Sequence, residues 1–141
     1  MYLSLITDMY SRKIVGYHLG ASLDTEQTLK ALQMALRDKP KDAWPIHHSD
    51  RGCQYCSHDY VQALEKSALG VSMTEQNHCA ENAMAERVNG ILKQEYGLGY
   101  RFNNTLDMHQ AVKQAVWFYN TRRPHSSLGL ETPEHIHRMV A

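Results

Sequence analysis

The first half of the chain alternates between strand-like and helix-like segments. Two β-rich runs are separated by five residues, the length of a hairpin connection, so two antiparallel strands are expected. Apolar residues then recur at helical spacing up to Pro40, and further short apolar runs follow. The expected order is strand 2–7, strand 13–19, helix 25–38, strand 44–48, helix 57–68 and strand 71–73.

Capping residues mark the expected helix ends. Asp24 and Gln27 lie three residues apart, the spacing of an N-cap and its reciprocal partner. Ser57 is placed to cap the second helix, and Gly70 is placed to stop it. A further helix is expected from about residue 105 to residue 121.

The segment from about 80 to 96 predicts an amphipathic helix. An apolar stripe at i, i+4, i+7 and i+8 is formed by Met84, Val88, Ile91 and Leu92. At about 100° per residue, Glu86 lies nearly opposite this stripe, and Asn82, Asn89 and Lys93 share its side. The simplest interpretation is a solvated polar face, and the neighbouring residues decide whether it is more than that.

Length and composition set the class of protein. With 141 residues and 43% hydrophobic content, the chain suits one globular domain. It has no apolar run near the roughly 20 residues that cross a bilayer and no secretory signal pattern, so no membrane partner is expected. Three cysteines do not describe a disulfide framework, which favours the cytoplasm. Fifteen basic and fifteen acidic residues cancel, so any nucleic-acid contact must be local.

Four short motifs give the chain its most specific pattern. Thirty-five residues separate Asp50 in the second motif from Glu86 in the third. The motifs are Asp8-x-x-Ser11-Arg12-Lys13-Ile14-Val15-Gly16, Ile46-His47-His48-Ser49-Asp50-Arg51-Gly52, Asn82-Ala83-Met84-Ala85-Glu86-Arg87-Val88-Asn89-Gly90, and Tyr119-Asn120-x-x-Arg123-Pro124-His125-x-x-Leu128 followed by Thr132-Pro133. Together they resemble the catalytic core of insertion-sequence transposases, the integrase core of the Asp-Asp-Glu transposase and retroviral integrase superfamily, over about residues 1–133.

The resemblance implies an α/β fold of the ribonuclease H-like class. This is a mixed five-stranded sheet with flanking helices, of which the chain would lack the first strand. Without that central strand, the strands at Tyr2–Thr7 and Ile46–His48 would leave backbone groups unpaired. We therefore expect the isolated chain to be marginally stable or to associate through the gap. Residues 1–122 would form the truncated catalytic core and residues 123–141 the C-terminal tail of the transposase.

The implied function is DNA transposition through metal-dependent phosphodiester cleavage and strand transfer. Asp50 and Glu86 would be catalytic and would bind two Mg²⁺ (or Mn²⁺) ions, since hard cations take oxygen ligands. The first acid of the triad has no secure counterpart. Asp8 was weighed for it, but its place in a hairpin turn favours a structural role. With two acids we expect weak metal binding and little or no turnover, which leaves open whether this chain is an enzyme.

The resemblance also implies that DNA is the partner, as transposon ends and target, and that the protein is a homo-oligomer associated with the bacterial nucleoid when active. Lys93 follows Glu86 by two helical turns, about 11 Å along the axis, so it can contact a phosphate without disturbing the carboxylate. The weaker candidates for DNA contact are Arg87, Asn89 and Arg123, with Arg122 and His125 as further backbone contacts.

Two alternatives stay open. A zinc-stabilised binding module is suggested by the C-x₂-C pair Cys53 and Cys56 with His47, His48 and His58 within a dozen residues. It lacks a second C-x₂-C or H-x₃₋₅-H pair, with His78 and Cys79 the nearest later candidates. The other alternative is a non-catalytic transposase remnant, which would keep the fold and lose the chemistry.

Overall fold

The computed structural model describes residues 1–49, 52–73 and 83–140, and the chain forms two compact units. Unit 1 comprises Met1–Ile6 and Val15–Ala83, and unit 2 comprises Thr7–Ile14 and Met84–Ala141. The chain therefore passes from one unit to the other inside its first hairpin. The predicted boundary between residues 122 and 123 separates the catalytic core from the C-terminal tail of the transposase, which is not the division into these two units. That boundary stays a prediction.

The first two strands form a hairpin. β1 (Tyr2–Thr7) and β2 (Ile14–Gly20) pair with each other. Their connection is too short for a parallel crossover, which takes a dozen or more residues, so the pair is antiparallel as predicted. At the turn, the N–H of Asp8 donates to the C=O of Lys13 at 2.8 Å.

The other two described strands form a separate parallel pair. β3 (Ile46–Ser49) lies beside β4 (Gly70–Met73), with Ile46 opposite Gly70 and Ser49 opposite Met73. The described strands thus form two separate pairs, β1 with β2 and β3 with β4. Within the described residues, β1 and β3 have one partner strand each. Association through an uncovered strand edge stays a prediction.

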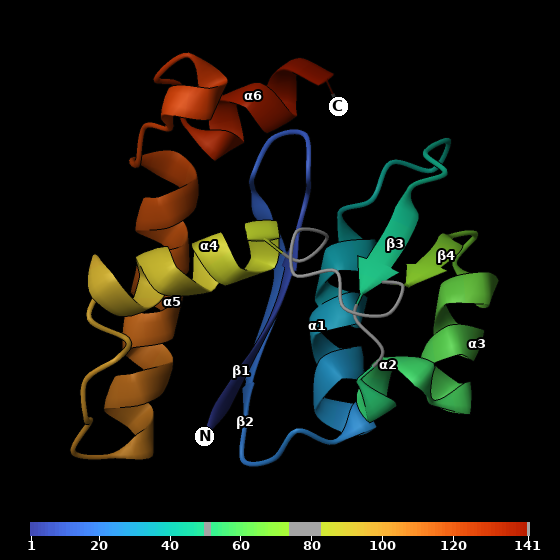
Figure 1. The fold of residues 1–141 in the computed structure, drawn as a ribbon, viewed down its shortest axis with the longest axis horizontal. Helices are drawn as coiled ribbons and strands as arrows, with labels where there is room; N and C mark the ends of the chain where they lie inside the picture. Colours follow the sequence, from blue (N-terminus) through green and yellow to red (C-terminus); the bar gives the residue numbers. More distant parts are fainter. Residues whose placement is uncertain (50–51, 74–82, 141) are drawn as a thin grey trace. The chain divides into compact units, whose positions relative to one another are not determined.

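Three helices pack together in unit 1 (Figure 1): α1 (Thr25–Arg37), α2 (Cys53–Cys56) and α3 (His58–Lys66). Their core is formed by the buried side chains of Leu32, Tyr60 and Leu64, against which half-buried residues such as Ile6 and Leu36 pack. The Ser57 hydroxyl accepts a hydrogen bond from the N–H of Tyr60 at 3.3 Å, so the predicted cap of α3 is confirmed. The single turn of α2 is too short for its periodicity to be read from the sequence.

The predicted reciprocal cap of α1 is wrong. Asp24 is the N-cap residue, but its side chain makes no capping hydrogen bond and accepts instead from the Ser22 hydroxyl. Gln27 is engaged elsewhere, because its Oε1 lies 2.8 Å from Nε2 of His18 on β2. A contact with a neighbouring strand has replaced the local one, and spacing along the sequence does not reveal such a competitor.

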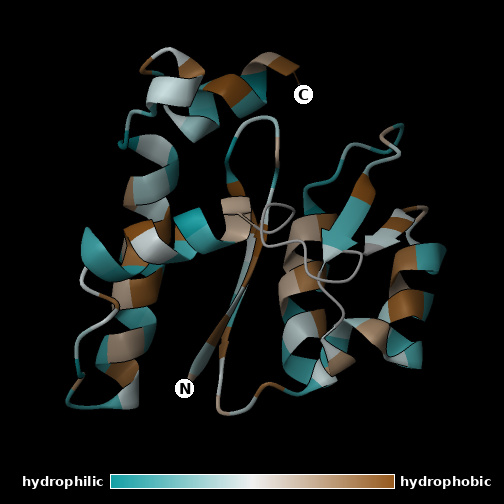
Figure 2. Cartoon of the chain, viewed as in Figure 1, coloured by the Kyte–Doolittle hydropathy of each residue, from teal (hydrophilic) through white to brown (hydrophobic). Residues whose placement is uncertain are grey.

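Unit 2 contains α4 (Ala83–Gln94), α5 (Thr105–Thr121), the 3₁₀ turn η2 (Ser126–Leu128) and α6 (Pro133–Val140). The predicted apolar stripe of α4 is buried, except that Met84 is half-buried, and hydrophobic and hydrophilic residues share the helix (Figure 2). The fully buried apolar residues of the two longer helices are Val88, Ile91, Leu92, Val112, Ala115, Val116 and Tyr119. None of the described helices is long and apolar enough to span a membrane.

Gly16 sets how closely β2 approaches α1. A Cβ at this position would lie 2.2 Å from the backbone oxygen of Ala31, which cannot move away as a flexible side chain can. We therefore expect Gly16→Ala to lower the free energy of unfolding by about 1–3 kcal/mol. The control is Gly90→Ala in α4, where the added Cβ would meet no atom within 4 Å apart from its own helix backbone and chain neighbours. This substitution should raise the free energy of unfolding by about 0.5–1 kcal/mol. Urea denaturation of both variants measures this, and equal effects would contradict it.

Candidate functional site

Glu86 lies in the first turn of α4, where its carboxylate is exposed to solvent. An acidic side chain is favourable there, because the helix N-terminus carries partial positive charge. No described residue forms a hydrogen bond or ion pair with this carboxylate. Its predicted partner Asp50 falls outside the described residues, as does Asn82, so whether the two acids meet stays a prediction.

The predicted DNA-contacting residues of α4 are accessible. Lys93 is exposed in the last turn, Arg87 is exposed one residue after Glu86, and Asn89 is half-buried. The burial of Val88, Ile91 and Leu92 leaves the opposite side of the helix, with Glu86 and Lys93, directed away from the core. The polar face therefore forms as predicted, and its function stays a prediction.

Two of the residues proposed for a zinc site, His47 and His48, have other partners. His47 Nε2 lies 3.0 Å from the Tyr60 hydroxyl, and the two rings pack edge to face. Burial lowers the pKa of His47, which keeps the ring neutral in this core. His48 Nδ1 lies 3.1 Å from Oγ of Ser72. In the described parts of the chain, no three His, Cys, Asp or Glu residues are grouped to hold a metal.

Asp8 organises the hairpin turn. Its Oδ1 accepts from the N–H of Tyr10 at 3.0 Å, and its Oδ2 accepts from the Ser11 hydroxyl at 2.8 Å and lies 3.0 Å from Nδ1 of His137. Burial raises the pKa of Asp8, but the hydrogen bonds from Ser11, Tyr10 and His137 outweigh it, and the pKa is lowered overall. Through these contacts Asp8 stabilises the turn. The prediction that Asp8 does not bind the catalytic metal remains a prediction.

Asp8, Ser11 and His137 are the residue types of a hydrolytic triad, but their geometry is different. A triad uses opposite nitrogens of the imidazole for the serine and the carboxylate. Here Nδ1 of His137 lies 3.0 Å from both Ser11 Oγ and Asp8 Oδ2. Ser11 is also completely buried, so a substrate cannot reach its hydroxyl. This cluster fastens the turn to α6 and is not a nucleophilic site.

The end of α5 holds the strand that leaves the turn. The Asn120 side chain accepts from the N–H of Ile14 at 2.9 Å and donates to the C=O of Ile14 at 3.0 Å, so it pairs with the backbone as a neighbouring strand would. The Tyr119 hydroxyl donates to the C=O of Arg12 at 3.0 Å. In the sequence, Tyr119 and Asn120 are recognisable only as part of a family motif, because nothing there links them to residues more than a hundred positions away.

Arg123 is held by an ion pair. Its Nε and Nη2 donate to the two carboxylate oxygens of Glu95, both at 2.7 Å, a bidentate arrangement. The hydrogen bond with Glu95 raises the pKa of Arg123, and the pKa of Glu95 is lowered correspondingly. The Nη1 of Arg123 also lies 3.4 Å from Nδ1 of His125. The proposed DNA contact of Arg123 must therefore compete with a protein carboxylate.

His125 is buried against Tyr119, with ring centroids 5.1 Å apart at 79°. Burial lowers the pKa of His125 to about 4, and the charge of Arg123 adds to this effect. Arg122 lies over the Trp117 ring, its Cζ 5.4 Å from the centroid. Neither residue is shown to contact DNA, so both assignments stay predictions.

The final helix was not expected from the sequence. In α6, Thr132 Oγ1 accepts from the N–H of His135 at 3.3 Å, and Pro133 occupies the first helical position, where its missing N–H costs nothing. Glu134 in the first turn pairs with Lys13 at 2.7 Å. The run Thr132-Pro133-Glu134 is also a helix-start signal that predicts α6, a meaning separate from its place in the fourth motif.

Both halves of the chain match one protein family. The family model described as "Integrase core domain" matches residues 1–79, and a second model with the same description matches residues 67–133. The first match includes Asp50, and the second includes Glu86. The chain belongs to the integrase core family. The resemblance found in the sequence is thereby confirmed.

Curated relatives of this integrase core are proteins of bacterial insertion sequences. The chain is 42% identical to the "Insertion element IS600 uncharacterized 31 kDa protein" of Shigella sonnei, covering 100% of the chain and 54% of the relative. It is 33% identical to the transposase of IS629 from Shigella sonnei (94% and 45%) and 35% identical to the transposase InsF of IS3A from Escherichia coli K12 (95% and 47%). This integrase core therefore spans about half the length of these relatives.

Solved structures confirm the fold class. Simian T-cell lymphotropic virus intasome, solved with the PP2A regulatory subunit B56 gamma, matches with a TM-score of 0.80 at 21% identity, over 96% of this integrase core and 47% of that chain. The HTLV-2 integrase catalytic core domain in complex with magnesium, in a trimeric form, matches with a TM-score of 0.71 at 21% identity, over 93% and 80%. At this identity the likeness shows the fold, and the predicted ribonuclease H-like class is confirmed.

The pairing of Asn120 with Ile14 predicts a large stability effect. In Asn120→Ala, the buried N–H and C=O of Ile14 lose their partners, and each such loss costs about 1–3 kcal/mol. We expect the free energy of unfolding to fall by about 2–4 kcal/mol in thermal or urea denaturation. Asn103→Ala, at an exposed position, is the control and should change it by less than about 0.5 kcal/mol. Similar effects of both substitutions would contradict a stabilising role for the pairing of Asn120 with Ile14.

His125 predicts a stability loss in acid. Its folded-state pKa of about 4 lies below the ordinary value of 6.5, so the unfolded chain takes up the proton first. The contribution of His125 is fully present above pH 6.5 and is lost as the pH falls toward 4. We expect the melting temperature of His125→Gln to fall less steeply than that of the wild type over this range. The exposed His109→Gln should follow the wild-type curve, and parallel curves for all three would refute the prediction.

Proposed function

We propose that this integrase core belongs to the catalytic region of an insertion-sequence transposase, which cleaves DNA phosphodiesters and transfers strands in a metal-dependent reaction. Family membership over both acidic motifs supports this function. The observation that carries it is the position of Glu86, exposed in the first turn of a helix whose opposite side is buried. The complete reaction would take place in the whole protein, of which this chain matches about half the length.

The donor chemistry of Glu86 fits a divalent metal. A carboxylate is the hard oxygen ligand that Mg²⁺ and Mn²⁺ prefer, and no described residue neutralises this one. Asp50 would be the second ligand. Two bound ions would activate water or a 3′-hydroxyl and stabilise the leaving oxygen. Magnesium is present in the structure of the HTLV-2 integrase core, a protein of the same fold, which supports the same ion here.

DNA would lie along the polar side of α4. Lys93 shares the exposed side with Glu86, two turns away, so its ammonium can contact a backbone phosphate while the carboxylate holds metal. The HTLV-2 integrase core was solved in trimeric and dimeric forms, which supports the proposal that this protein acts as a homo-oligomer. As a bacterial-type transposase it would work in the cytoplasm at the nucleoid.

Metal titration tests the assignment of the two acids. We expect the 141-residue chain to bind Mn²⁺ weakly, and Asp50→Asn or Glu86→Gln to reduce the affinity by at least about tenfold, since even residues that only support metal ligands contribute that much. Calorimetry or the electron paramagnetic resonance signal of free Mn²⁺ measures the affinity.

The control for this titration is Glu65→Gln, which removes an exposed glutamate from α3 and should bind Mn²⁺ like the wild type. Unchanged affinity in both acid variants, together with a loss in Asp8→Ala, would reassign the site to Asp8 and disprove its structural role.

A further inference from the structure

One side of α4 is contacted by arginines at both of its ends. Met84, Arg87, Ile91 and Glu95 follow each other at steps of three or four residues, so they share a side of the helix axis. Arg12 reaches the start of this row, with Nη1 3.1 Å from Sδ of Met84. Arg123 reaches its end through the bidentate pair with Glu95. Arg87 lies between them on the helix.

This arginine row, defined as Arg12, Arg87 and Arg123, carries more positive charge than its surroundings neutralise. Arg123 and Glu95 neutralise each other directly. The side-chain partner of Arg12 is a thioether, a weak acceptor for a group that has five N–H donors. Among the described residues, neither Arg12 nor Arg87 takes part in a salt bridge. The row therefore has two guanidinium groups with donors to spare, in a chain whose net charge is zero.

The Arg12 side chain starts from a fixed backbone. Arg12 has φ 65°, the left-handed region that residues with a Cβ rarely adopt. Its N–H donates to the C=O of Asp8 at 2.8 Å, and its own C=O accepts from the Tyr119 hydroxyl at 3.0 Å. Such backbone conformations persist where the surroundings determine them, and they are enriched at ligand clamps. Arg12 is thus placed before any ligand arrives.

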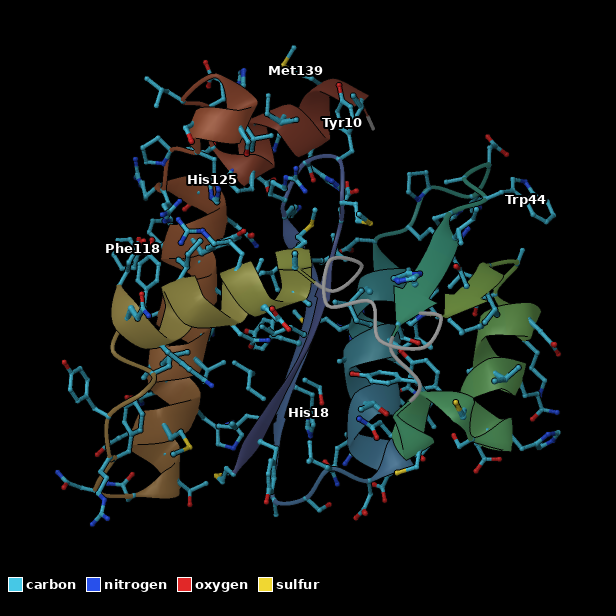
Figure 3. The ribbon with its side chains drawn as sticks, viewed as in Figure 1. Tyr10, His18, Trp44, Phe118, His125 and Met139 are labelled. Carbon is cyan, nitrogen blue, oxygen red and sulfur yellow. The ribbon has the colours of Figure 1, made fainter. Side chains whose placement is uncertain are left out.

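His125, labelled in Figure 3, contacts Arg123 at the end of the row. Its Nδ1 faces Nη1 of Arg123, which can only donate, so Nδ1 is the acceptor and the proton of the neutral ring is on Nε2. Nε2 is buried and has no hydrogen-bond partner among the described residues, and only 8% of the surface of His125 is exposed. Burial is the largest cause of the lowered pKa of His125, and the charges of Arg123, Arg12 and Arg87 lower this pKa further.

We propose that Arg12 and Arg87 form a phosphate-binding site whose ligand is a backbone phosphate of DNA. The choice of DNA rests on the proposed function. Guanidinium groups present planar pairs of donors that match phosphate oxygens. Arg87 follows Glu86 directly, so it lies about 100° around α4 from the acid. A strand held by the arginine row would pass beside the metal-binding face and would be positioned by it.

The test measures DNA binding by the 141-residue chain without metal. Fluorescence anisotropy of a labelled mixed-sequence duplex, in chelator and at increasing salt, gives the slope of log K against log salt. We expect Arg12→Gln and Arg87→Gln each to weaken binding and to reduce the magnitude of the slope by about 1, the effect of losing one phosphate contact. Arg101→Gln, an exposed arginine between α4 and α5, is the matched control and should leave the slope unchanged.

The exposure of Arg87 and one further variant keep the result clear. Arg87 is exposed, so its substitution reports on binding even if Arg12→Gln disturbs the turn. Arg12→Lys keeps the charge without the planar pair of donors, and we expect it to keep the slope while binding more weakly. An unchanged slope in Arg87→Gln, or a change of the same size in Arg101→Gln, would overturn the site.

The source of the phosphate is decided by nuclear magnetic resonance of the arginine Nε–H signals. We expect the signals of Arg12 and Arg87 to shift to saturation with the duplex, and less with inorganic phosphate alone. A shift with inorganic phosphate and none with the duplex would overturn DNA as the ligand. The DNA-binding assay contains chelator and therefore does not depend on a bound metal. If the separate titration showed no Mn²⁺ binding at Glu86, it would refute the proposed metal site but not the phosphate-binding site.

Discussion

The pairing of the Asn120 amide with the backbone of Ile14 is the interaction on which unit 2 depends. It connects two parts of the chain that are 106 positions apart through two buried hydrogen bonds. Because Ile14 ends the hairpin turn, this pairing also fixes where the turn meets the helices. The contacts of Asp8 with His137, of Lys13 with Glu134 and of Arg12 with Met84 all follow from that placement.

The rotation of α4 about its axis decides which residues the helix offers to a ligand. Burying a large apolar side chain stabilises by about 1.5–3 kcal/mol, whereas an exposed ion pair contributes about 0–1 kcal/mol. The buried residues Val88, Ile91 and Leu92 therefore fix the rotation, and the charged residues occupy the positions that remain. Glu86 is consequently presented on one side of the helix, and Arg87 on the side next to it.

Charge is distributed locally in this protein, which is how a chain of zero net charge can have a basic site. Glu95 is committed to Arg123, so the carboxylate that would otherwise neutralise the arginine row is already paired. The Arg123 guanidinium holds α4 to the segment after α5, and its contact with DNA stays a prediction. In the C-terminal motif, Tyr119, Asn120 and Arg123 all form hydrogen bonds with other parts of unit 2.

Periodicity and local signals in the sequence determined most elements: the hairpin, α1, α3, α4 and α5, the cap at Ser57, and the exposed side of Glu86. These features depend on neighbours a few residues away. Only the tertiary structure decided the partners of Gln27, Asn120 and Arg123, because each binds a group from a distant segment that competes with local bonds or solvent. The arginine row belongs to this second group, since Arg12 reaches Met84 on α4 from a segment 72 positions away in the sequence.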